Sequence, residues 1–185
     1  MKSLLNYIGK KSNIDIHDII LKNKLDIDTY CEPFSGGFSA GLNLIEKGFK
    51  GKVILNDLDF EVYNFWIVLR DNYEELMDRI NNALNSIFKY DENDDKLQVI
   101  KEYKISNDNI DRACAEYISQ QSLTMKGLRI KANKFRDTEI DFFLQSKSLE
   151  NVIIRNCDYS EILREYSSDK TFFFNRPSIL YRWCE

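Results

Sequence analysis

The chain has 185 residues, 43% of them hydrophobic and 30% charged, which is enough apolar sequence to bury one sizeable core. It has no apolar stretch long enough for a membrane span, no signal peptide, and four cysteines without C-x-x-C spacing, so we expect a cytoplasmic protein with no membrane partner, disulfide framework or metal site. Its net charge of −4 argues against simple affinity for DNA, because an acidic chain repels phosphate unless its basic residues are segregated.

A glycine-rich turn lies between a predicted strand and a predicted helix in the first quarter of the chain. Residues 30–44 read Tyr-Cys-Glu-Pro-Phe-Ser-Gly-Gly-Phe-Ser-Ala-Gly-Leu-Asn-Leu. Turns of this kind hold nucleotide-like cofactors against backbone N–H groups at the start of a helix. These residues alone fit a plain tight turn equally well, so the choice depends on the segments around them.

Three further apolar strands are predicted, and two of them end in a carboxylate. Residues 53–59 carry Asp57 about 20 residues after the turn, where an acid accepts from ribose hydroxyls in nucleotide-binding folds. Residues 151–159 end in Asp158, and residues 170–174 form the last strand. Strands that alternate with helical segments predict an α/β fold with a Rossmann-like sheet flanked by helices.

The sequence between these strands is mostly helical in its hydrophobic period. Residues 59–88 predict one or two helices whose apolar face carries Val62, Phe65, Trp66, Leu69, Leu76 and Ile80. Residues 99–121 and 138–149 are also read as helical, with Phe142 and Phe143 facing inward. We therefore divide the chain into a core of residues 1–58 and 137–185 and a helical insert of residues 59–136. The aromatic residues are expected in the core rather than on a base-stacking platform, and His17 is given no catalytic role.

Charged residues gather in two places within the insert. The acidic run 91–95 is expected to be a solvated loop. A segment free of acids carries the basic residues Lys126, Arg129, Lys131, Lys134 and Arg136. A solvated surface explains such a cluster too, but its place in the chain favours contact with nucleic-acid phosphates.

These segments, in this order, resemble DNA adenine-N6 methyltransferases of the Dam type (D12 class, phage-like branch), and the resemblance runs from Tyr7 to the end of the chain. The resemblance implies S-adenosylmethionine as cofactor and DNA as partner, and it makes residues 117–136 similar to the entrance of the target-recognition region. The residues that match the family's cofactor pocket are Tyr7, Gly9, Lys11, Glu32, Pro33, Phe34, Gly36 and Gly37, together with Asp57 near the ribose and Asp158 at the adenine amino group.

Two positions depart from the family pattern. Phe38 stands where many relatives have the second glycine of Gly-x-Gly, although phage-type members also place a large apolar residue there. Residues 175–178 read Asn-Arg-Pro-Ser where the family has the catalytic motif Asp-Pro-Pro-Tyr. In that motif the first residue accepts from the target amino group, and the tyrosine stacks on an adenine flipped out of the duplex. The degenerate catalytic positions are thus Asn175 and Pro177.

The altered motif predicts little or no methyl transfer. Asn175 still offers an acceptor oxygen, because a neutral amide has the acceptor geometry of a carboxylate. Serine offers no ring to hold an extruded base, and Arg176 places a permanent cation beside a sulfonium cofactor and an amine that becomes positive during attack. Codons can be chosen for residues 175–184 whose adjacent reading frame restores the motif. A one-base shift in the gene is therefore a hypothesis that sequencing the gene tests.

Three interpretations of function remain from the sequence. The first is a catalytically defective binding protein, a pseudoenzyme that a phage or mobile element uses against a host nuclease of a restriction or CRISPR system. The second is an active S-adenosylmethionine-dependent DNA adenine-N6 methyltransferase, and the third is a folded relic. The family sheet continues beyond the fourth motif, so the resemblance also implies that residues 171–174 form an exposed edge strand. We expect either a homodimer that pairs or covers this edge, or a chain that is stable only with a partner.

Overall fold

The computed structural model describes residues 1–6, 14–124, 127–128, 130–131, 135, 137 and 139–175. The chain forms two compact units. Unit 1 consists of Met1–Ser3, Tyr7–Tyr63 and Ser148–Glu185, and unit 2 consists of Leu4–Asn6 and Asn64–Lys147.

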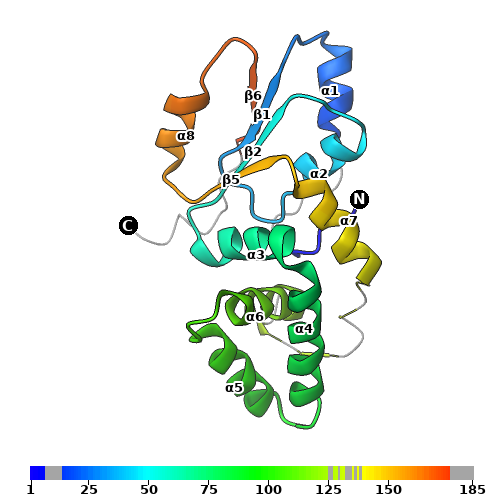
Figure 1. Ribbon diagram of the computed structural model, residues 1–185, viewed down its shortest axis with the longest axis vertical. Helices are drawn as coiled ribbons and strands as arrows, with labels where there is room; N and C mark the ends of the chain where they lie inside the picture. The colour runs from blue at the N-terminus through cyan, green and yellow to red at the C-terminus, as the bar shows by residue number, and fades with distance from the viewer. Residues whose placement is uncertain are drawn as a thin grey trace. The chain divides into compact units, whose positions relative to one another are not determined.

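Unit 1 is an α/β unit built on a parallel sheet, which confirms the predicted fold class (Figure 1). Its four strands are β1 (Thr29–Glu32), β2 (Lys52–Asn56), β5 (Val152–Arg155) and β6 (Thr171–Phe173), in the spatial order β5-β2-β1-β6. Its helices are α1 (Ile16–Lys22), α2 (Ser39–Glu46) and α8 (Tyr159–Tyr166). In the sheet of the described residues, β6 is an edge strand that pairs only with β1.

Alternating residues of the strands face opposite sides of this sheet. Cys31 and Ile54 are neighbours in the register of β1 and β2, and they form a buried cluster with Ile162 of α8. On the other face, the Glu32 side chain reaches the backbone N–H of Gly41 in α2. The sheet is therefore covered by α8 on one face and by α2 on the other, as buried parallel sheets require.

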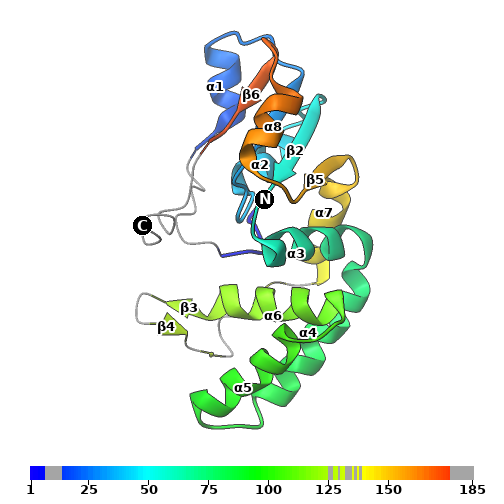
Figure 2. The same cartoon turned by 90° about the vertical axis from the view of Figure 1, so that its left-hand side faces the viewer.

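Unit 2 is helical among its described residues (Figure 2). It contains α4 (Tyr73–Ile87), α5 (Asn93–Lys104) and α6 (Asn109–Ser122), which pack on one another, and a short antiparallel pair of β3 (Leu123–Thr124) and β4 (Gly127–Leu128). Helices α3 (Phe60–Asp71) and α7 (Glu139–Leu149) run from one unit into the other. The predicted apolar face is buried at all six positions, namely Val62, Phe65, Trp66, Leu69, Leu76 and Ile80.

Two predictions about this part of the chain were wrong in detail. Phe142 is buried in the core, but the neighbouring Phe143 is 40% exposed and packs edge-on against Tyr73. Adjacent residues on a helix cannot both point to one narrow face, so Phe142 faces the core and Phe143 does not. Asp94 and Asp95, predicted in a loop, lie in the first turn of α5, where the helix dipole favours acids.

Residues Leu4 and Leu5 are buried in unit 2, far in sequence from the helices that hold them. The Leu4 backbone N–H donates to Gln145 at 3.1 Å, and its carbonyl accepts from Gln121 Nε2 at 2.7 Å. Gln121 also donates to Asp137 at 3.0 Å. These side-chain amides satisfy the backbone groups of Leu4, which lies outside any helix or strand.

No helix in the described part of the chain is both long and apolar enough to cross a bilayer. Within that same part, no group of histidine, cysteine and acidic residues could hold a metal ion. The described cysteines Cys31, Cys114 and Cys157 are free thiols.

Candidate functional site

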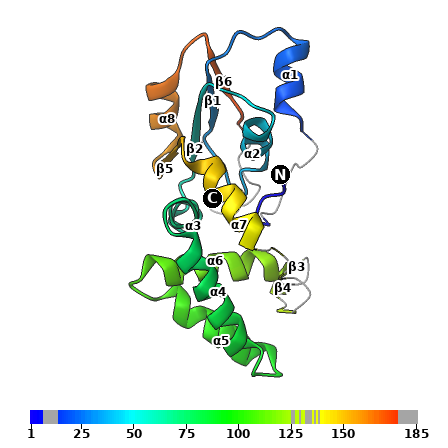
Figure 3. The same ribbon diagram turned by 45° about the vertical axis from the view of Figure 1, so that its right-hand side comes forward.

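The candidate site lies at the carboxyl edge of the parallel sheet in unit 1. From β1 the chain passes outward through β2 to β5, whereas β6 pairs on the opposite side of β1. The strand order therefore reverses between β1 and β6, and ligands of open α/β sheets bind in the crevice outside such a switch point. The glycine-rich loop after β1 leads into α2 on one side of the sheet, and the loop after β5 leads into α8 on the other (Figure 3).

Glu32, the last residue of β1, is buried, and its carboxyl group accepts hydrogen bonds inside the protein. Its Oε1 atom accepts from the Tyr30 hydroxyl at 2.7 Å and from the backbone N–H of Gly41 at 2.7 Å. Burial raises the pKa of Glu32 to about 8, so the side chain keeps its proton at neutral pH. Glu32 thus ties β1 to the first turns of α2 and fixes where the intervening loop stands.

The loop itself contains two residues in the left-handed region. Gly36 has a φ of 47°, which glycine adopts without strain. Phe38 has a φ of 47° as well, an unfavourable conformation for a residue with a Cβ. Its ring is buried and lies over Gly41, where an added Cβ would be only 2.2 Å from the Phe38 Cε2 atom. The large Phe38 side chain is therefore matched by a glycine in the first turn of α2.

Asp57, directly after β2, holds the glycine loop from the neighbouring strand end. Its Oδ2 atom accepts from the backbone N–H of Gly36 at 2.8 Å, and its Oδ1 atom accepts from that of Asp59 at 3.1 Å. Burial raises the pKa of Asp57, and these backbone donors act in the opposite direction. A carboxylate has lone pairs beyond those two bonds, so Asp57 can also accept from a ligand hydroxyl.

Asp158 lies after β5 and is exposed. It is the N-cap of α8, where its Oδ1 atom accepts from the Ser160 N–H at 2.8 Å. The hydrogen bonds from Ser160 lower the pKa of Asp158, which is consequently ionised at neutral pH. The next residue, Tyr159, contacts Phe34 with ring centroids 5.3 Å apart, so the loops after β1 and β5 meet at this edge.

Exposed apolar side chains surround these acids, and the sequence analysis did not single them out. Leu58 follows Asp57 and is 50% exposed, and Tyr159 follows Asp158 and is 47% exposed. Apolar surfaces beside strand-end carboxylates suit a purine nucleoside, whose ring stacks while its amino and hydroxyl groups donate. The sequence signal that could have identified these two residues is their position, because each directly follows an acid at a strand end.

The loop and the start of α2 also carry buried polar atoms that suit a cofactor with a charged tail. The hydroxyls of Ser35 and Ser39 are buried and have no hydrogen-bond partner among the described residues. Buried hydroxyls normally find a partner. The residues present therefore fit S-adenosylmethionine: the apolar and acidic groups suit a nucleoside, Ser35 stands in the loop that precedes α2, and Ser39 is the first residue of that helix.

Asn175 is exposed and lies directly beyond β6. The Phe174 N–H donates to the Cys31 carbonyl at 2.8 Å, which extends the pairing of β6 with β1 past Phe173. Asn175 is therefore delivered to the carboxyl edge beside the loop after β1.

The structure brings together the predicted residues Glu32, Pro33, Phe34, Gly36, Gly37, Asp57 and Asp158 at one edge of the sheet. Of the basic cluster, Lys131 is exposed. The remaining predicted site residues lie outside the described residues, namely Tyr7, Gly9, Lys11, Lys126, Arg129, Lys134, Arg136 and Pro177.

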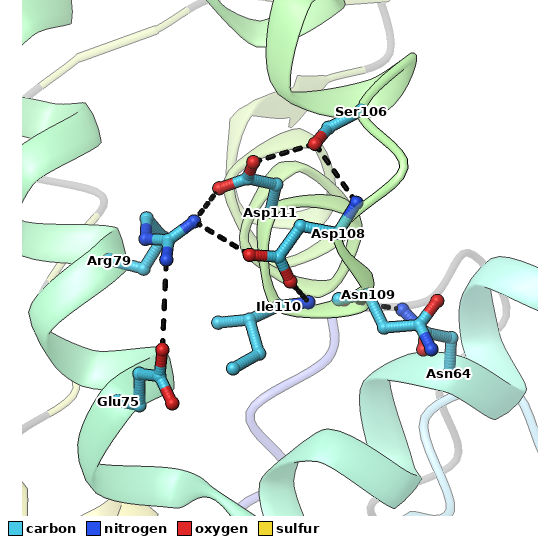
Figure 4. A network of polar contacts seen from close by, with 8 residues as sticks. All are labelled: Asn64, Glu75, Arg79, Ser106, Asp108, Asn109, Ile110 and Asp111. Atoms are coloured by element: carbon cyan, nitrogen blue, oxygen red, sulfur yellow. Dashed lines mark hydrogen bonds and ion pairs between the residues drawn. The ribbon is translucent and has the colours of Figure 1, made fainter.

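A second polar cluster, in unit 2, is a structural network (Figure 4). Arg79 of α4 pairs with Asp111 of α6 and, at 3.4 Å, with Asp108. Asp111 also accepts from the Ser106 hydroxyl at 2.7 Å, and Asp108 accepts from the Ile110 N–H at 2.8 Å at the start of α6. Arg79 also pairs with Glu75 of its own helix at 3.8 Å, so one guanidinium serves three carboxylates and the cluster joins α4 to α6.

Comparison with known proteins gives the family of the chain. The family model for D12 class N6 adenine-specific DNA methyltransferases matches residues 7–178. A search of curated proteins found no match.

Proposed function

The chain belongs to the D12 class N6 adenine-specific DNA methyltransferase family, and we propose that it binds S-adenosylmethionine but transfers little or no methyl group to DNA adenine. The family's reaction needs two parts, a pocket for the methyl donor and a clamp for an extruded adenine. In this chain the pocket is retained and the clamp is lost.

Support for cofactor binding comes from the carboxyl edge of unit 1. Glu32 and Asp57 position the loop after β1 through hydrogen bonds to Gly41 and Gly36. Leu58 and Tyr159 give apolar surface beside Asp57 and Asp158, which accept from ribose hydroxyls and from an adenine amino group, respectively. When bound, S-adenosylmethionine supplies a methyl group activated by its sulfonium.

The observation that carries the proposal is the residue set at the end of β6. Asn175 reaches the edge as an amide acceptor, but the sequence continues Arg-Pro-Ser instead of Pro-Pro-Tyr. Extruding a base costs a few kcal/mol, and stacking on an aromatic ring returns about 1–3 kcal/mol per base. Ser178 cannot provide this stacking. A guanidinium at residue 176 also opposes positive charge that develops on the attacking amine.

A second candidate is an active DNA adenine-N6 methyltransferase. It is favoured by one observation: the end of β6 brings Asn175, whose amide oxygen can accept from a substrate amino group, to the carboxyl edge of the sheet beside the loop after β1. The two candidates differ in their products.

The test separates binding from transfer. Purified chain is titrated with S-adenosylmethionine by calorimetry, and in parallel it is incubated with tritiated S-adenosylmethionine and duplex DNA that lacks adenine methylation. Saturable binding without label in N6-methyladenine supports the proposal. Label in N6-methyladenine supports the second candidate, and absence of binding rejects both.

We further propose that a phage or mobile element uses the chain to counter host defence. In this role the chain binds and inhibits a host restriction or CRISPR nuclease. A net charge of −4 favours a basic partner surface of the kind that nucleases present to DNA. The measurement is the plating efficiency of a restricted phage on hosts with and without the chain. Unchanged plating on every restricting host tried would remove this extension.

A further inference from the structure

Two asparagine side chains join the loops that carry the site residues. Asn56 is the last residue of β2 and is fully buried. Its Nδ2 donates to the Pro33 carbonyl and to the Cys157 carbonyl, both at 3.0 Å, and its Oδ1 accepts from the Cys157 N–H at 3.1 Å. One side chain thus holds the loop after β1 and the loop after β5 to the end of the strand between them.

Asn156 makes the reciprocal connection. It follows β5, and its Nδ2 donates to the Asp57 carbonyl at 2.8 Å and to the Leu58 carbonyl at 3.1 Å. Asn56 is paired with Arg155 in the strand register, so the two amides lie at neighbouring strand ends. Each asparagine holds the backbone that follows the other strand.

The backbone groups around residue 56 require an amide side chain. Beyond the last ladder pair, backbone N–H and C=O groups of a buried sheet need other partners. Asn56 satisfies one N–H and two carbonyls with a single neutral group. A carboxylate at the same place would lose both donors and face two carbonyl oxygens, and an apolar residue would leave the three backbone groups unpaired.

We propose that Asn56 and Asn156 are positioning residues that fix the separation of Asp57 and Asp158, and so the width of the nucleoside end of the pocket. The inference rests on the proposed cofactor binding for its consequence, but its geometric part stands on the ligand-free chain. Neither asparagine contacts the cofactor in this account. They act through Asp57, Leu58 and the loop after β5.

The experiment uses Asn156, because this side chain is exposed and its substitution leaves the core intact. Asn156→Ala removes both hydrogen bonds, and Asn156→Asp keeps the side-chain size while removing the Nδ2 donors. Asn151→Ala is the matched control, since Asn151 is exposed at the opposite end of β5. Dissociation constants are measured for S-adenosylmethionine and for methylthioadenosine, which lacks the amino-acid part.

Both Asn156 variants are expected to bind each of the two ligands about tenfold more weakly than the wild-type chain does, by the same factor for both ligands. Their melting temperatures should equal that of the Asn151→Ala control. Equal loss for both ligands places the effect at the nucleoside. Binding at the wild-type level in both variants overturns the inference, as does a loss confined to S-adenosylmethionine.

A ligand-free measurement keeps the inference separate from the proposed function. Hydrogen exchange is followed at the backbone amides of Gly36 and Asp59, both of which donate to the Asp57 carboxylate. Faster exchange at these amides in Asn156→Ala, and not in Asn151→Ala, supports the positioning role even if the wild-type chain binds no S-adenosylmethionine. Unchanged exchange at both amides contradicts it, whatever the chain binds.

Discussion

The contact between Phe38 and Gly41 makes the most specific stability prediction. An alanine Cβ at position 41 would lie 2.2 Å from Cε2 and 2.3 Å from Cζ of the Phe38 ring. That ring is buried, so it can move aside only by displacing the side chains packed around it. Overpacking of this kind costs about 1–3 kcal/mol, whereas glycine to alanine inside a helix gains about 1 kcal/mol. Gly41→Ala should therefore lower the free energy of unfolding by up to about 2 kcal/mol.

The sign of this effect should reverse when the ring is removed. Phe38→Gly relieves about 1–2 kcal/mol of left-handed strain but loses the buried ring, worth about 3–5 kcal/mol in phenylalanine truncations. Alone it should destabilise by about 1–4 kcal/mol. On that background Gly41→Ala no longer meets the Phe38 ring and should stabilise by about 1 kcal/mol through helix propensity. The coupling between the two substitutions then equals the overpacking cost, about 1–3 kcal/mol.

The assay is denaturant-dependent hydrogen exchange at the amides of β1 and β2, which reports on unit 1 by itself. The four chains of the double-mutant cycle are compared under one set of conditions. If Gly41→Ala destabilises by the same amount with and without the Phe38 ring, the reasoning about this contact is refuted.

Three other changes test the site and its support. The pKa of Glu32 in the folded state, about 8, lies above its unfolded value of 4.5. Between these two pH values the folded state holds an extra proton. The free energy of unfolding therefore falls as pH rises, by at most about 1.4 kcal/mol per pH unit. Glu32→Gln should remove that part of the slope in urea unfolding, and an unchanged slope would contradict the burial argument. Arg79→Met should lower stability by about 1–3 kcal/mol, because it leaves the half-buried Asp111 without its cation, and a change under 0.5 kcal/mol in thermal unfolding would count against this reading. Asp57→Asn should weaken S-adenosylmethionine at least tenfold in calorimetry, since a single amide oxygen cannot serve two backbone donors and a ribose hydroxyl; wild-type affinity would exclude Asp57 from the pocket.

Much of unit 1 could be predicted because its signals are local. Apolar runs that end in Asp57 and Asp158 marked β2 and β5, and the glycine turn marked the start of α2. The resemblance to the family then supplied the functional reading, which the family match confirmed at the level of the family.

Other features depend on tertiary contacts that no local pattern records. The sequence shows Glu32 as a polar residue beside a turn, and only the approach of Tyr30 and Gly41 makes it a buried anchor. Asn56 looked like an ordinary residue before an acid, yet it satisfies backbone groups of two loops that lie 23 and 101 residues away in sequence. The side on which Phe143 lies was mispredicted for the same reason, because helical period gives a face but not its edges.

The central claim is that this chain holds the methyl donor and does not pass the methyl group to adenine. The most direct measurement is one reaction series on wild-type chain and on Asp57→Asn, in which S-adenosylmethionine binding and tritium incorporation into unmethylated duplex DNA are both followed. The account predicts saturable binding by the wild-type chain, weaker binding by the variant, and no label in adenine above a reaction without protein. Label in N6-methyladenine with the wild-type chain alone would contradict it.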